Sequence, residues 1–88
     1  MYTLCLPKID SNTTRKQLFN IFNQYNFGLI KKIDLISLSQ SKRAFIHYQN
    51  WNDNEKNKKI KSYLDDGLDI KIIYDFPWFW KCSKSRSN

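Results

Sequence analysis

Apolar and polar residues alternate along the last part of the chain. From Leu68 to Trp80 every even-numbered residue is apolar, and several odd-numbered residues are charged. A period of two is typical of a strand with one buried face. The run is longer than an average strand of about 5–6 residues, and Pro77 interrupts it. We therefore predict a strand over residues 68–74, followed by a separate aromatic segment.

Three earlier segments alternate in the same way. They are residues 2–9, 29–36 and 43–48, and each predicts a strand. A short polar turn over residues 38–42 separates the last two of these segments. A connection of that length predicts an antiparallel hairpin.

A helix is predicted over residues 14–26. It begins with a capping box, in which Thr14 is the N-cap and Gln17 reaches back to it. We expect Gly28 to adopt the left-handed conformation that ends this helix. Its inward stripe has the spacing of an amphipathic helix and consists of Leu18, Ile21, Phe22 and Tyr25.

A second helix is predicted to start at Asn52 or Asp53 and to end at Gly67. Its apolar stripe is narrow, so only a small part of its surface can pack. Its lysines are expected to form a solvated surface, because this helix would lie behind the sheet.

The resulting order of elements is β-α-β-β-α-β. This order predicts an α+β, ferredoxin-like fold, with a four-stranded antiparallel sheet and two helices on one face. Right-handed crossovers would place the first and third strands centrally, flanked by the second and fourth. The aromatic segment would then lie beyond the end of the sheet as a flap. We therefore divide the chain into a domain of residues 1–75 and an extension of residues 76–88, which ends in a basic, serine-rich tail.

Length, composition and charge limit the classes of protein to which this chain can belong. A chain of 88 residues forms one domain, and its 41% hydrophobic and 16% aromatic content argues against disorder. The formal net charge of +7 favours an anionic partner, with nucleic acid first and acidic lipid second. The alternative is that scattered lysines serve solubility alone. Without a long apolar run or a secretory signal, we expect an intracellular protein of the cytoplasm or nucleus, with no membrane partner.

The sequence gives little support for a metal site or a catalytic site. A closed zinc site needs four Cys or His ligands, and the chain has one histidine, His47, and two cysteines, Cys5 and Cys82. We expect the cysteines to be reduced. No nucleophile–base constellation can be assembled around one histidine. We therefore expect no enzyme, no cofactor and no metal.

Two strand segments carry a family resemblance. Residues 4–9 lie where the RNA recognition motif family has its first-strand motif. Residues 41–48, S-K-R-A-F-I-H-Y, match the third-strand motif of that family at Ala44, Phe45, Ile46 and Tyr48. The chain therefore resembles an RNA recognition motif over about residues 2–75.

The resemblance implies a role for the sheet face that the helices leave open. In that family, aromatic side chains on this face stack on splayed bases. Phe45 retains one such aromatic position, whereas Arg43 and Cys5 replace the other two. A guanidinium can still stack on a base or pair with a phosphate. The same face should carry Lys71 and Ile73 from the fourth strand.

The ending F-P-W-F-W-K also resembles the endings of short uncharacterised proteins of large DNA viruses. The abundance of Asn, Lys and Ile suggests an AT-rich coding sequence, which fits such a source. If the protein is viral, its location would be the host cytoplasm or nucleus. This resemblance implies no mechanism.

The aromatic segment has three interpretations. It could fold back over the sheet or its rim as a satellite core. It could extend a stacking surface for nucleic acid. It could also dock a protein partner or a second copy of the chain, because tryptophan is enriched in interface hot spots. The residues to which all three interpretations apply are Phe76, Trp78, Phe79 and Trp80.

We therefore predict a module that binds single-stranded RNA, or DNA, through the open sheet face and the basic aromatic ending. The alternative is a protein-interaction or homodimerisation module that has kept the fold and lost base stacking. The candidate nucleic-acid-binding residues are Cys5, Arg43, Phe45, His47, Lys71, Ile73, Trp78, Trp80, Lys81, Lys84 and Arg86.

Overall fold

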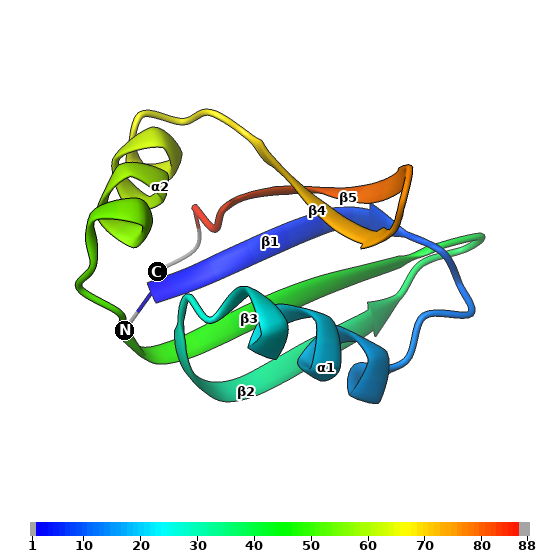
Figure 1. The fold of residues 1–88 in the computed structure, drawn as a ribbon. Coiled ribbons are helices and arrows are strands. Elements are labelled where there is room, and N and C mark those ends of the chain that lie inside the picture. The colour runs from blue at the N-terminus through cyan, green and yellow to red at the C-terminus, as the bar shows by residue number, and fades with distance from the viewer. Residues whose placement is uncertain (1, 87–88) are drawn as a thin grey trace.

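Five strands form one antiparallel sheet in the computed structural model, which describes residues 2–86 (Figure 1). The elements in chain order are β1 (Tyr2–Ile9), α1 (Arg15–Tyr25), β2 (Gly28–Ser37), β3 (Lys42–Trp51), α2 (Glu55–Asp65), β4 (Ile70–Asp75) and β5 (Trp78–Lys84). The strand order across the sheet is β2-β3-β1-β5-β4. The predicted α+β class with two helices is confirmed, and the predicted number of four strands is wrong.

The additional strand is the segment that we expected to form an aromatic flap. β5 pairs with β1 on one side, where Cys5 lies opposite Ser83, and with β4 on the other. The β4–β5 hairpin turns at Phe76 and Pro77, whose peptide bond is cis. β4 thus lies at the edge of the sheet, and β5 takes the place beside β1 that we had given to β4. Pro77 does not end the strand pattern, because it lies in the turn, where no ladder hydrogen bond is needed.

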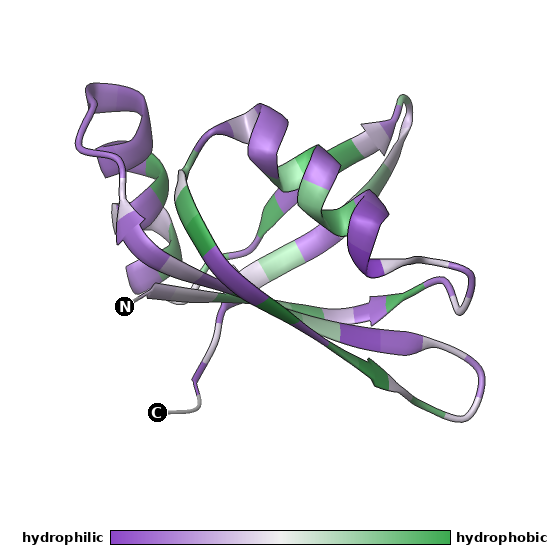
Figure 2. Cartoon of the chain, turned by 90° about the horizontal axis from the view of Figure 1, so that it is seen from below, coloured by the Kyte–Doolittle hydropathy of each residue, from purple (hydrophilic) through white to green (hydrophobic). Residues whose placement is uncertain are grey.

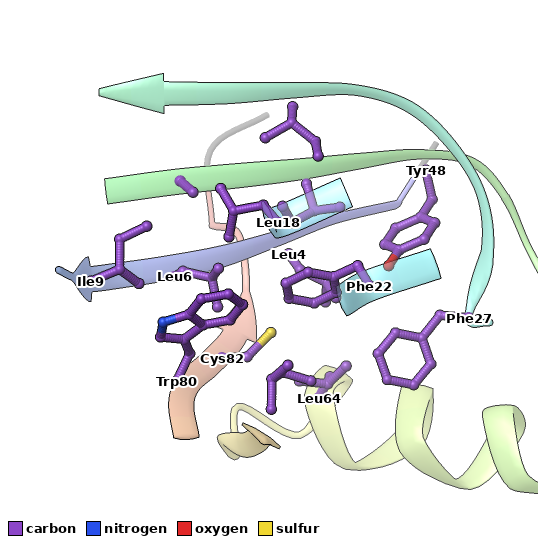
Figure 3. Packing of buried hydrophobic residues seen from close by; sticks show 14 residues of the cluster. Leu4, Leu6, Ile9, Leu18, Phe22, Phe27, Tyr48, Leu64, Trp80 and Cys82 are labelled. Carbon is purple, nitrogen blue, oxygen red and sulfur yellow. The ribbon is translucent and has the colours of Figure 1, made fainter. Parts of the chain in front are cut away.

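The core lies between the helices and the even-numbered residues of β1, β3, β4 and β5. Figure 3 shows Leu64 of α2 pointing into the same core as Leu6 of β1 and Cys82 of β5. α1 contributes Leu18 and Phe22. The other buried apolar residues of this cluster are Leu4, Ile9, Phe27, Ile33, Ala44, Ile46, Tyr48, Ile72 and Trp80.

Trp80 is part of this core, contrary to the expectation that the aromatic segment lies beyond the end of the sheet. Only 4% of Trp80 is exposed. Its ring stacks on Tyr74 at a centroid distance of 4.5 Å and lies parallel to Phe22 of α1 at 6.3 Å. Phe76 and Trp78 at the hairpin tip do remain exposed, at 82% and 64%. The aromatic segment is therefore divided between the core and the surface.

α1 begins and ends through local capping contacts. The Thr14 side chain accepts a hydrogen bond from the backbone N–H of Gln17 at 3.1 Å, as the capping box predicts. The left-handed residue at the C-terminus is Asn26, with φ of 56°, and not Gly28. Gly28 already belongs to β2, where a Cβ would lie 2.0 Å from the carbonyl oxygen of Asn50. Glycine is therefore required at position 28 for close strand approach.

α1 also reaches the backbone of both edge strands. Near its start, the Arg15 Nε donates a hydrogen bond to the Ile33 carbonyl oxygen of β2 at 3.0 Å. At its end, the Tyr25 hydroxyl accepts a hydrogen bond from the Ile73 N–H of β4 at 2.8 Å. Because one helix contacts both edges, the sheet must curl around it. Figure 2 shows α1 lying across one side of the strands, and no helix of residues 2–86 crosses the other side.

Replacing Trp80 by alanine should destabilise the fold strongly, whereas the same change at Trp78 should not. Trp80→Ala leaves a cavity beneath α1 and should cost about 3–5 kcal/mol of unfolding free energy. Trp78→Ala removes an exposed side chain and should cost about 1 kcal/mol or less. Urea unfolding of both variants measures the difference. Equal losses would contradict the position of β5 in the sheet.

Candidate nucleic-acid interface

The face of the sheet opposite α1 carries the odd-numbered residues of β1, β3, β4 and β5. The strand register places Phe45 of β3 between Asp34 of β2 and Cys5 of β1, and Cys5 lies opposite Ser83 of β5. One row of side chains therefore crosses four strands. Phe45 is its only aromatic member and is partly exposed. We call this side of the sheet the open face.

A second aromatic side chain reaches the open face from β5. Phe79 lies opposite Ile73 of β4, and Lys81 lies opposite Lys71. The Lys71 ammonium lies over the Phe79 ring, 4.8 Å from its centroid, in a cation–π contact. Phe79 and Ile73 are 46% and 44% exposed. Phe79 thus shares the face with Phe45. On a flat sheet, two strand spacings and four residue rises would separate these two residues by roughly 16 Å.

A hollow opens at one end of the open face, where β1 and β5 meet the chain that follows α2. Its volume is about 670 Å³. It brings the predicted residues Cys5, Phe45, Lys84 and Arg86 to one place. Its other lining residues are Leu64, Asp65, Gly67, Asp69, Ser83 and Ser85. Arg86, near the end of the described chain, therefore lines the same hollow as Phe45.

Two of the predicted cations on β5 are paired within the chain, and one of them, Lys84, lies on the helix side of the sheet, opposite the buried Leu4. The Lys81 ammonium lies 3.4 Å from the Asp69 carboxylate, and the Lys84 ammonium lies 3.1 Å from the Asp65 carboxylate. Burial raises the pKa of Asp65, but hydrogen bonds from Tyr2 and Lys84 outweigh it and lower the pKa overall. Asp65 therefore stays ionised and compensates the charge of Lys84.

Other cations of the face have different contacts. The Arg43 Nε donates to the Pro7 carbonyl oxygen at 3.3 Å, which leaves its terminal nitrogens for other contacts. Lys71 stands over an aromatic ring. The cations that could contact phosphate groups from this side are therefore Arg43, Lys71 and Arg86.

His47 has a defined structural position on this face. Its Nδ1 lies 3.0 Å from the Thr3 hydroxyl, and its Nε2 lies 2.8 Å from an Asp34 carboxylate oxygen. Only 18% of its side chain is exposed. The His47 hydrogen bond lowers the pKa of Asp34 below its ordinary value. The β2 side of the face therefore carries a negative charge beside Phe45, and the side of β5 and β4 suits phosphates better.

The two cysteines lie on opposite sides of the sheet and are both free. Burial raises the pKa of the Cys5 thiol, although Arg43 opposes this effect. Burial also raises the pKa of Cys82. Both groups are therefore neutral thiols at physiological pH, without the low pKa of a reactive cysteine. Among residues 2–86 we found no group of three His, Cys, Asp or Glu side chains placed to hold a metal ion.

The two tryptophans of the aromatic segment lie in different environments. Trp80 lies in the core and is not accessible for stacking, whereas Trp78 lies at the exposed hairpin tip. Phe79, which is not among the predicted nucleic-acid-binding residues, lies with Phe45 on the open face. Its odd number, shared with Lys71 and Ile73, was the signal that could have placed it there. Pro77 hides this signal, because it interrupts the alternation of apolar and polar residues before Phe79.

Comparisons with protein-family models, curated proteins and solved structures each found no match for this chain. The helices described between residues 2 and 86 are all too short or too polar to cross a membrane.

Replacing Asp34 by asparagine should lower the melting temperature at neutral pH. The folded state lowers the pKa of Asp34, so its stabilisation is present above the unfolded pKa of about 3.9 and disappears as the pH falls through the folded pKa. The difference between wild type and Asp34→Asn should therefore shrink between about pH 5 and pH 2. Asp53→Asn, at a carboxylate that is 83% exposed, is the control. A difference that does not depend on pH would contradict the contact with His47.

Proposed function

We propose that this protein binds single-stranded nucleic acid, and RNA before DNA, on the open face. The observation that carries the proposal is the presence of two accessible aromatic residues, Phe45 and Phe79, on one face that also carries Arg43, Lys71 and Arg86. Base stacking on aromatic side chains is worth about 1–3 kcal/mol per base and needs no particular sequence. Such a face suits unpaired bases better than a duplex, whose bases are already stacked.

The spacing of the two aromatic residues implies a bound segment of several nucleotides. At a separation of roughly 16 Å on a flat sheet, Phe45 and Phe79 would stack on bases that are not adjacent. The strand would run diagonally across β1 and β5. Lys71 would contribute at the Phe79 end, and Arg86 would contribute beside Phe45.

The charges on the open face favour the same path of the bound strand across β1 and β5. Asp34 lies on the β2 side of Phe45, and phosphates would avoid it. Phosphate contacts would therefore gather over β5 and β4. Lys81 could join them if a phosphate replaced Asp69 as its partner. Affinity built from such contacts falls steeply with added salt, because bound counterions are released from the nucleic acid.

The proposal includes a likeness to the RNA recognition motif. β2, β3 and β1 lie side by side in the order expected for the first three strands, whereas the strand on the other side of β1 is β5 and not β4, the strand that directly follows α2. Phe45 lies on the face that this family uses for stacking. Cys5 and Arg43 depart from the family at the other two positions, and Phe79 on β5 supplies an aromatic residue elsewhere on the face.

A second candidate function rests on the tip of the β4–β5 hairpin. Phe76 and Trp78 are 82% and 64% exposed and lie at adjoining positions of the tip. Exposed aromatic residues of this kind mark protein interfaces. The tip would then dock a protein partner or a second copy of the chain.

Phe45→Ala and Phe79→Ala should each weaken the binding of a short single-stranded RNA by roughly 5-fold to 150-fold, given about 1–3 kcal/mol per stacked base. Tyr63→Ala is the matched control, because Tyr63 is 49% exposed on α2 and does not line the hollow at the open face. Fluorescence anisotropy with a labelled oligonucleotide at two salt concentrations measures both effects. Wild-type affinity should fall as salt rises.

Sedimentation of the same samples separates the two candidate functions. A monomer without oligonucleotide that forms a complex with it supports binding on the open face. Unchanged affinity in both phenylalanine variants would contradict that proposal. A dimer that Trp78→Ser converts to monomer, without any oligonucleotide binding, would favour docking through the hairpin tip.

A further inference from the structure

A groove runs between α1 and the edge strand β2, apart from the open face. Its volume is about 380 Å³. Its lining residues come from the first half of α1 and the middle of β2, and they are Arg15, Lys16, Phe19, Ile30, Lys31, Lys32 and Ile33. The proposed nucleic-acid interface uses none of these residues.

The floor of the groove is apolar. Phe19 is 45% exposed although it lies on a helix whose apolar stripe is otherwise covered. Ile33 and Ile30 lie on the strand side of the groove, buried and partly exposed respectively. A large apolar side chain from outside would cover the Phe19 ring and gain the free energy of removing it from water.

The rim of the groove is strongly positive. Four of its seven lining residues are cations, and none of the seven is acidic. Lys32 lies 4.0 Å from Asp34, whereas Lys16 and Lys31 have exposed side chains. α1 has no acidic residue in its first turn, whereas α2 has Glu55. Arg15 and Lys16 lie in the first turn of α1, at the positive end of the helix dipole, where an external carboxylate would be stabilised.

The edge of β2 at this groove is unsuited to adding another strand. The Arg15 Nε already occupies the Ile33 carbonyl oxygen at 3.0 Å. The pairing of β2 with β3 is irregular between Leu29 and Lys32, as at a β-bulge, and bulges on edge strands oppose further pairing. An occupant must therefore bind through its side chains and not through a backbone ladder.

We propose that this groove binds an acidic peptide segment of a partner protein. One large apolar side chain of the segment would pack on Phe19, and flanking carboxylates would pair with Lys16 and Lys31. A nucleic acid fits the rim charge but would leave the apolar floor without a matching group. The protein would then bind nucleic acid and an acidic protein segment on separate surfaces.

The test uses the full chain and labelled synthetic peptides in fluorescence anisotropy. The probe peptide carries one leucine flanked by glutamates. Two comparison peptides replace the glutamates by glutamines or the leucine by alanine. The probe should bind at least about tenfold more tightly than either comparison peptide, because each lacks one half of the proposed contact.

Variants locate the site. Phe19→Ser and Lys31→Glu should each weaken probe binding about tenfold, whereas Lys59→Glu on α2 and Tyr63→Ser should not. Phe19 is half exposed, so Phe19→Ser should fold, and circular dichroism verifies this. An excess of single-stranded RNA should leave probe binding unchanged.

Three outcomes would overturn the proposal. The glutamine peptide could bind as well as the glutamate peptide. Phe19→Ser and Lys31→Glu could both leave the affinity unchanged in a folded protein. The RNA could also displace the probe in wild type and not in Lys31→Glu, which would assign the groove to nucleic acid. Loss of RNA binding in Phe45→Ala with normal peptide binding would leave this proposal intact.

Discussion

The burial of Trp80 beneath α1 determines the position of β5, and most of the surface depends on that position. Its ring lies between Tyr74 and Phe22 with 4% exposed, so β5 cannot leave the sheet without opening the core. Because side chains alternate along a strand, burying Trp80 and Cys82 turns Phe79 and Lys81 to the opposite face. One core contact thus places an aromatic residue and a cation on the open face.

α1 also contacts both edge strands and holds them in the sheet. It contacts the backbone of β2 through Arg15 and that of β4 through Tyr25. Both contacts satisfy polar groups on edge strands, which would otherwise be open to pairing with other chains. The molecule then presents three surfaces of different character. They are the open face with two accessible aromatic residues, the exposed hairpin tip, and the cation-rimmed groove beside Phe19.

The local patterns of the sequence were sufficient to predict most helices and strands and the α+β class. Thr14 is the expected N-cap of α1, and the alternating segments all become strands. The main error concerns Pro77, which interrupts the alternation in the sequence but lies in a hairpin turn. That error concealed β5, the burial of Trp80 and the place of Phe79. The contacts of His47 and the hollow beside Arg86 depend on strand register, which no local pattern determines.

The central claim is that β3 and β5 act together in one nucleic-acid interface. The most direct test is a titration of the ¹⁵N-labelled full chain with a short single-stranded RNA, followed by NMR. The account predicts that backbone signals of Phe45, Phe79 and Lys71 shift together with one saturation curve, while those of α1 stay in place. Shifts confined to the hairpin tip at Phe76 and Trp78, or to the helices, would contradict it.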